Sequence, residues 1–371
     1  MPMPRLTALL VVSAVAAAAP PIRREGPFWV QTTEASQNLP AAAQLRIRGA
    51  GNITVHGREG RQLRYQLVRR VRARNAAEAR ARLAAFEGAL VRRHGGLLLD
   101  LSRAAEGAAE SDLHVTVPRG LPSLALNTLL GNLDVSDLDG SLQADTGAGT
   151  VAVHRVKGGV VVDTQGGATS LDEIGGRVRI DSAGGAILAD LLRGDAVLAT
   201  GGGDIVVQRV NGTLRAFTAG GGIRIRQAGG LVTATTAGGP IQVGAAPGVH
   251  CESGSGTIRL NDVSGAVHVE TATGSIVAAL LPGSGLRDSF LSTLDGDITV
   301  LIPANVRVML RAENEGSGDV RSISSDFPGL RIRSDGGSVR AEGPINGPGG
   351  PVLRLAGSGR IYIKRRRGNS Q

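Results

Sequence analysis

Two sets of side chains in the sequence combine residue types and spacing that suit a metal ion. The first set contains two histidines and two glutamates that repeat at an 18-residue interval: His250, Glu252, His268 and Glu270. Imidazole nitrogens and carboxylate oxygens are ligands of zinc and similar metals. The second set contains aspartates at the same interval: Asp145, Asp163 and Asp181. Stacked carboxylates of this kind could hold calcium or another hard cation.

Both sets also fit an ordinary solvated surface. Two carboxylates about 4.8 Å apart in water repel each other by only about 0.9 kcal/mol, so a column of aspartates needs no bound cation. Histidine and glutamate side chains in neighbouring rows likewise need no metal in order to face water. We therefore expect no bound metal and no cofactor, and we retain both sets as candidate ligands only.

This 18-residue interval belongs to an internal repeat that extends from about Thr128 to about Val300. Its main glycines keep the interval until one residue is lost and four are later inserted: Gly131, Gly149, Gly167, Gly185, Gly203, Gly221, Gly239, Gly256, Gly274 and Gly296. A second glycine series lies nine residues after the first: Gly140, Gly158, Gly176, Gly194, Gly212 and Gly230. Alternating apolar residues follow, as in Leu142 and Ala144, and this alternation is typical of half-buried strands.

Each repeat therefore predicts a strand, a turn, a second strand and a second turn. Because no single unit can bury its apolar row, the units must stack into an all-β fold, a parallel β-solenoid with 18-residue coils. Parallel strands joined by crossovers are nearly always right-handed, so we expect a right-handed β-helix. A left-handed hexapeptide helix would repeat small residues every six positions. A calcium-loaded β-roll would need Gly-Gly-x-Gly-x-Asp in every turn, and most turns here lack the aspartate.

A serine or threonine precedes each main glycine by three positions, as Thr146 and Thr218 do. These residues share strand parity with Leu142 and Ala144, so we expect them to point inward. There the hydroxyl groups can bond to backbone groups of the turns. Cys251 lies in the same inward row as Ala144, which predicts a buried and inert thiol.

The composition is basic and poor in aromatic residues. The chain has 371 residues, a formal net charge of +9, 55 glycines and 2% aromatic residues. Narrow coils leave little room for rings, which accounts for the low aromatic content. Almost all of the positive charge is arginine, a bias that nucleotide composition can produce, so we expect no nucleic-acid partner.

Residues 1–20 have the pattern of a secretory signal. Arg5 precedes the apolar run Leu6–Val15, and the small residues Ala16–Ala19 follow it. No other long apolar run exists, so we expect no transmembrane segment in the mature chain. A lone cysteine fits export without disulfides. The expected location is the periplasm, the cell surface or the extracellular space, and the pattern leaves open whether the signal is cleaved or anchors the chain.

The segments around the repeat predict further parts. Residues 21–43 are expected to be a flexible lead. Residues 44–120 are expected to be a separate small α+β cap, because an open solenoid end is an unpaired sheet edge that invites aggregation. Residues 121–300 would be the regular solenoid. The remaining parts would be irregular C-terminal coils at 301–365 and a basic tail at 366–371.

One helix is expected within the cap. Asn75 can cap its start, with Glu78 at the capping-box position. An apolar stripe would follow at Leu83, Phe86 and Leu90. Arg92 and Arg93 would lie near the C-terminal end of the helix, and Gly95 would end it.

The sequence shows no motif that would place a catalytic site on the coils. It has no nucleophile elbow, phosphate loop or metalloprotease motif. Polysaccharide-cleaving β-helices use long loops and aromatic platforms, whereas the coils here are nearly free of loops and Trp29 lies outside them. We therefore expect the protein not to be an enzyme.

Three stretches resemble the bacterial putative-adhesin domain family of unknown function: Asp112–Pro118, Leu124–Val135 and Ala356–Ile363. The repeated Thr/Ser-x-x-Gly-x-Ile/Val-x-Val units are also similar to that family. The resemblance covers about residues 44–365 and implies an exported right-handed β-helix on or near the cell envelope. It supplies no catalytic residues.

These observations predict a non-catalytic, adhesin-like binding or structural surface of the bacterial cell envelope. Its expected partners are cell-surface polymers or envelope proteins, and the oligomeric state stays open. The alternatives are a self-assembling envelope scaffold and a polysaccharide-acting β-helix enzyme.

Overall fold

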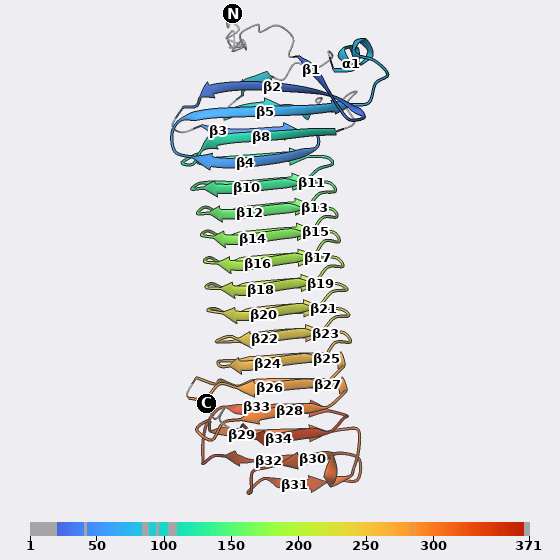
Figure 1. Ribbon diagram of the computed structural model, residues 1–371. Helices are drawn as coiled ribbons and strands as arrows, with labels where there is room; N and C mark the ends of the chain where they lie inside the picture. Colours follow the sequence, from blue (N-terminus) through green and yellow to red (C-terminus); the bar gives the residue numbers. More distant parts are fainter. Residues whose placement is uncertain are drawn as a thin grey trace, which may run out of the picture. The chain divides into compact units, whose positions relative to one another are not determined.

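The computed structural model describes residues 21–40, 43–83, 89–93, 96–102, 110–283 and 285–366. The predicted signal at residues 1–20 and the tail residues 367–371 lie outside this range. Contacts divide the chain into two compact units, residues 1–182 and 183–371. Figure 1 shows that each unit consists mainly of short stacked strands.

The regular coils of unit 1 build two parallel sheets. The β10 sheet contains β10 (Leu133–Leu138), β12 (Val151–Val156) and β14 (Thr169–Ile174). The β11 sheet contains β9 (Ser123–Thr128), β11 (Ser141–Thr146), β13 (Val160–Thr164) and β15 (Val178–Ser182). Partners in adjacent strands keep the 18-residue interval, as Leu133 and Val151 do. The predicted parallel β-solenoid with 18-residue coils is confirmed.

Unit 2 repeats this arrangement. The β18 sheet contains β16 (Ile187–Leu192), β18 (Ile205–Val210), β20 (Ile223–Ala228), β22 (Ile241–Ala245), β24 (Ile258–Val263), β26 (Ile276–Leu280) and β28 (Ile298–Ile302). The β19 sheet contains β17 (Ala196–Thr200), β19 (Leu214–Thr218), β21 (Val232–Thr236), β23 (Val249–Ser253), β25 (Val267–Thr273) and β27 (Ser289–Asp295). Alternate residues such as Ile205 and Val207 are buried, so the core lies between the two sheets.

Inward-facing hydroxyl groups hold the turns in place, as predicted. Thr218 is fully buried, and its Oγ1 donates to the carbonyl oxygen of Gly203 at 2.9 Å. Thr218 Oγ1 also accepts the backbone N–H of Gly221 at 3.1 Å. Thr200 and Thr236 make the same pair of contacts one coil away on either side. Thr164 is the exception, because its buried hydroxyl has no hydrogen-bond partner among the described residues.

The prediction of a separate cap over residues 44–120 is wrong for two pairs of strands, because they are coils of the solenoid itself. They are β3 (Gln44–Gly49), β4 (Asn52–Arg58), β7 (Gly96–Asp100) and β8 (Glu110–Pro118). Strand β3 pairs in parallel with both β7 and β9, and β4 pairs in parallel with both β8 and β10. The β3–β4 coil therefore lies between two coils that come later in the chain.

Antiparallel strands complete this end of unit 1. They are β1 (Ile22–Glu25), β2 (Phe28–Asn38), β5 (Gln62–Val71) and β6 (Ala89–Arg93). Strand β5 pairs with β8, β2 pairs with β5, and β1 pairs with β2. Strand β6 pairs with β7. The predicted flexible lead at residues 21–43 is therefore wrong, since β2 pairs with β5 from Trp29 to Asn38.

Helix α1 (Ala76–Leu83) begins where the sequence predicts. Asn75 Oδ1 accepts the backbone N–H of Glu78 at 2.9 Å. Ala79 and Leu83 bury one face of the helix in a cluster with Val71, against which Trp29 packs. The prediction that the helix continues to Arg93 is wrong, because Leu90, Arg92 and Arg93 belong to β6. Phe86 and Gly95 lie outside the described residues.

Unit 2 ends with a similar arrangement, built from β29 (Val308–Asn314), a 3-10 turn (Val320–Ser322), β30 (Ile323–Ser325), β31 (Arg331–Ser334), β32 (Val339–Ile345), β33 (Val352–Gly357) and β34 (Ile361–Arg365). Strand β33 lies between β27 and β29, and β34 lies between β28 and β30. The coil formed by β33 and β34 is therefore last in the chain but lies between two coils that come earlier in the chain. The expectation that residues 301–365 form only irregular coils is wrong for β31 and β32, which pair antiparallel with each other and, through β32, with β29.

Exposed arginines mark the outermost antiparallel strand at each of these ends. Arg23 and Arg24 lie on β1, and Arg331 and Arg333 lie on β31, where every residue is exposed. Charged side chains on an edge strand oppose pairing with another chain. No helix in the described part of the chain has the length and apolar character needed to cross a membrane.

Candidate functional site

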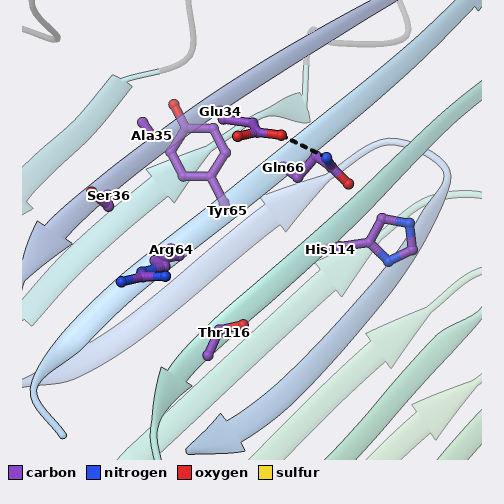
Figure 2. A pocket seen from close by; sticks show the side chains of 8 residues that line it. All are labelled: Glu34, Ala35, Ser36, Arg64, Tyr65, Gln66, His114 and Thr116. Carbon is purple, nitrogen blue, oxygen red and sulfur yellow. Dashed lines mark hydrogen bonds between the residues drawn. The ribbon is translucent and has the colours of Figure 1, made fainter.

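A shallow polar depression lies on the face of the antiparallel strands β2, β5 and β8 (Figure 2). Its volume is about 520 Å³, and it is lined by Glu34, Ala35, Ser36, Arg64, Tyr65, Gln66, His114 and Thr116. Strand register brings these residues together in cross-strand rows, one of which runs from Glu34 through Gln66 to His114. Glu34 Oε1 accepts a hydrogen bond from Gln66 Nε2 at 2.7 Å, as Figure 2 shows.

The depression offers hydrogen-bonding groups along its cross-strand rows. Arg64 and Gln66 supply donors, while Glu34 supplies acceptors. Burial raises the pKa of Tyr65 above its ordinary value, so this phenol stays protonated and can donate a hydrogen bond. Together these groups can form hydrogen bonds with a polar ligand. Sequence reasoning missed this site because residues 33–38 carry no apolar period that would predict strand β2.

The predicted histidine and glutamate rows are adjacent on the β19 sheet. His250 pairs with His268, and Glu252 pairs with Glu270. The two imidazole rings stack with centroids 4.8 Å apart and planes 7° apart. Each Nε2 lies close to the carboxylate of its own strand, at 2.7 Å for Glu252 and 2.9 Å for Glu270. Phe290 extends the row, with its ring 5.5 Å from that of His268.

This geometry does not form a metal site. A zinc–nitrogen bond is about 2.0–2.1 Å long, so two nitrogens on one ion lie at most about 4.2 Å apart. The two imidazole rings stack nearly parallel, with centroids 4.8 Å apart, and each Nε2 faces the carboxylate of its own strand, so the two rings do not converge on one ion. In the described ranges, no group of three or more His, Cys, Asp or Glu side chains is arranged to hold a metal ion.

The predicted aspartate column is also assembled, on the β11 sheet. Asp145 pairs with Asp163, which pairs with Asp181. Arg179 Nη2 lies 2.8 Å from Asp181 Oδ2, so one end of the column is neutralised. Burial, and then the charge of Asp163, raises the pKa of Asp145 above its ordinary value.

We expect the substitution Asp145→Asn to stabilise unit 1 at neutral pH by up to about 0.9 kcal/mol, the repulsion between two charges one strand spacing apart in water. Because the folded state raises the pKa of Asp145, its ionised form costs stability above that pKa. The gain should shrink as the pH falls through the pKa and vanish below about pH 3, where the carboxyl group is protonated in both states. Thermal unfolding from pH 3 to pH 7 measures it.

Asp181→Asn is the matched control for this prediction. It removes a repulsion and an ion pair with Arg179 together, so the two effects should nearly cancel. A loss of stability in Asp145→Asn at pH 7, or a gain that persists unchanged at pH 3, would contradict the prediction.

Ser136, His56 and Asp137 have the residue types of a hydrolase triad but the wrong connectivity. Ser136 Oγ lies 2.9 Å from His56 Nδ1, and Asp137 Oδ2 lies 3.3 Å from the same nitrogen. A triad requires the serine and the aspartate on opposite ring nitrogens. Arg155 donates two hydrogen bonds to Asp137, at 2.7 and 2.8 Å, and these lower the pKa of Asp137. In this arrangement Asp137 cannot hold one ring nitrogen of His56 while the opposite nitrogen takes the proton of Ser136.

Cys251 is buried, as the sequence predicts, and burial raises its pKa to about 12. Since the thiolate is the reactive form, we expect the native protein to resist iodoacetamide at pH 8 and to be labelled fully after denaturation. Mass spectrometry of the labelled chain measures this. Rapid labelling of the native protein would show that β23 opens to solvent.

Comparisons with known proteins leave the family open. No family model matches the chain, and no curated protein matches it. A crystal structure of a putative cell adhesion protein from Clostridium sporogenes is similar, with 8% sequence identity and a TM-score of 0.20 over 91% of this chain and 100% of that chain. So low a TM-score carries no argument, and the resemblance to the putative-adhesin family stays a prediction.

Proposed function

We propose that this protein is an exported, non-catalytic β-solenoid that provides an adhesin-like binding surface of the bacterial cell envelope. One observation carries the proposal: antiparallel strands cover a coil edge in each unit, with β5 on β8 in unit 1 and β32 on β29 in unit 2. Covered edges do not recruit another chain. The sides of the coils, with their rows of polar side chains, are then the surfaces left for partners.

The same observation disfavours the alternative of a self-assembling scaffold. Assembly through strand pairing needs a long, open, uncharged edge, whereas exposed arginines occupy β1 and β31 and the uncharged edge strand β30 has only three residues. The polar depression between Glu34 and Thr116 favours binding over a purely structural role. Export rests on the signal-like pattern of residues 1–20.

The local geometry of the nucleophiles supports the non-catalytic part of the proposal. His56 contacts Ser136 and Asp137 through the same nitrogen, so Asp137 does not orient it as a general base for Ser136. The thiol of Cys251 is buried, with its pKa raised to about 12. An acylating or phosphorylating mechanism needs a nucleophile with an adjacent, correctly oriented base.

A binding survey tests the proposal. The full chain is applied to an array of glycans and cell-wall polymers, with and without calcium and zinc. We expect saturable binding to one class of polymer, without a metal requirement. Arg64→Gln changes the depression, and Arg58→Gln is a matched control because Arg58 is also exposed but does not line it. The absence of binding to every polymer of the array would refute a polymer-binding role. Turnover of a polymer would refute the non-catalytic assignment.

A further inference from the structure

Four exposed arginines form a compact group on the outer face of the β18 sheet in unit 2. This arginine surface consists of Arg209, Arg224, Arg226 and Arg259. Arg224 pairs with Gln242, which pairs with Arg259, and Arg209 pairs with Gln227. Adjacent strands are about 4.8 Å apart, so Arg224 and Arg259 are about 10 Å apart at the backbone. Arg226 lies two positions beyond Arg224, about 7 Å along the same strand.

The four arginines of this surface make no salt bridge among the described residues, unlike several other basic groups of the protein. Arg155 pairs with Asp137, Lys157 with Asp139, Arg340 with Glu313 and Arg366 with Asp262. Arg224 Nε instead donates to the neutral Gln242 Oε1 at 3.2 Å. Clustered, unneutralised guanidinium groups repel one another and create a positive potential that attracts anions.

We propose that the arginine surface binds an extended polysaccharide that carries carboxylate groups. The proposal rests on the proposed function and names the ligand class and the face that recognises it. Planar guanidinium groups bind carboxylates through two parallel hydrogen bonds. A flat face with arginines on three of four successive coils suits an extended, regularly charged chain. The amides of Gln208, Gln227 and Gln242 lie among the arginines and can bond to sugar hydroxyl groups.

The same face is poorly suited to single-stranded nucleic acid. Proteins that bind such strands stack the bases on aromatic side chains. All residues of strands β16, β18, β20, β22, β24 and β26 are described, and none is aromatic. The arginine surface thus offers charge and amide groups without a stacking platform.

The test measures binding of the full chain to immobilised alginate, a carboxylated polysaccharide, with dextran, dextran sulfate and single-stranded DNA for comparison. We expect alginate to bind saturably and dextran not to bind. An exposed ion pair contributes up to about fivefold in affinity, so Arg224→Gln with Arg226→Gln should weaken alginate binding about tenfold. Added salt should weaken it as well. Circular dichroism melting confirms that the variants are folded.

A matched double variant removes the same charge elsewhere. Arg331→Gln with Arg333→Gln changes exposed arginines of the edge strand β31 and should leave alginate affinity within about twofold. An equal loss in both double variants would overturn the proposal, since net charge alone would then explain binding. Equal or tighter binding of DNA or dextran sulfate would overturn it too. If the chain bound only another polymer of the array, with an affinity that the Arg224→Gln and Arg226→Gln substitutions did not change, this inference would be overturned and the proposed function would stand. No binding to any polymer would refute both.

Discussion

Replacing Gly167 by alanine is expected to destabilise unit 1 by about 3 kcal/mol or more, enough to lower its melting temperature by several degrees. A Cβ atom on Gly167 would lie 1.8 Å from the carbonyl oxygen of Gly149 in the neighbouring coil. The backbone at Gly149 leads directly into β12 and the backbone at Gly167 into β14, so neither can move without disturbing the pairs between these strands. Urea denaturation of the full chain measures the loss.

The adjacent glycine provides the control. A Cβ atom on Gly166 would meet nothing within 4 Å, and Gly166 does not have a positive φ. Gly166→Ala should therefore be neutral, or stabilising by about 0.4–1 kcal/mol through a less flexible unfolded chain. Equal losses in the two variants would show that backbone flexibility, rather than the close approach of the turns, requires glycine there.

The second large effect is expected from Thr218→Val, which should destabilise unit 2 by about 2 kcal/mol, because buried polar groups without partners cost about 1–3 kcal/mol each. The substitution keeps the shape of the side chain but leaves the carbonyl of Gly203 and the N–H of Gly221 without their hydroxyl partner. Thermal and urea unfolding measure the change, and hydrogen exchange at Gly221 should accelerate.

Thr164→Val is the matched control, since Thr164 occupies the same repeat position but its hydroxyl has no partner among the described residues. We expect this substitution to change stability by no more than about 0.5 kcal/mol, or to increase it, because it removes an unsatisfied buried polar group. A large loss in Thr164→Val would mean that shape, rather than hydrogen bonding, decides which residue fits the turn.

The repeat could be predicted from sequence because each coil uses the same local rules. The main glycines mark close turns, and alternation places Leu142, Ala144 and Thr146 on one buried side. Register between successive coils follows from the constant 18-residue interval. The adjacency of His250 with His268 and of Asp145 with Asp163 therefore followed from counting alone.

The coils beside the antiparallel strands could not be predicted in this way. Leu45 pairs with both Leu97 and Leu124, and no interval in the sequence relates these positions. The end of α1 was missed for a related reason. Leu90 fits a helical stripe by spacing, yet its backbone pairs with Leu99 of β7. The polar depression depends on β2, whose polar residues give no strand pattern.

The insertion of the β3–β4 coil has a mechanical consequence. Tension that pulled on residues before β3 would first peel off β1 and β2, which pair along an outer edge. It would then reach a strand held by parallel ladders on both sides. Those two ladders must be sheared together, whereas an edge strand opens one hydrogen bond at a time. In unit 2, β34 is likewise held by β28 and β30, so force applied beyond β34 meets parallel ladders on both sides of that strand.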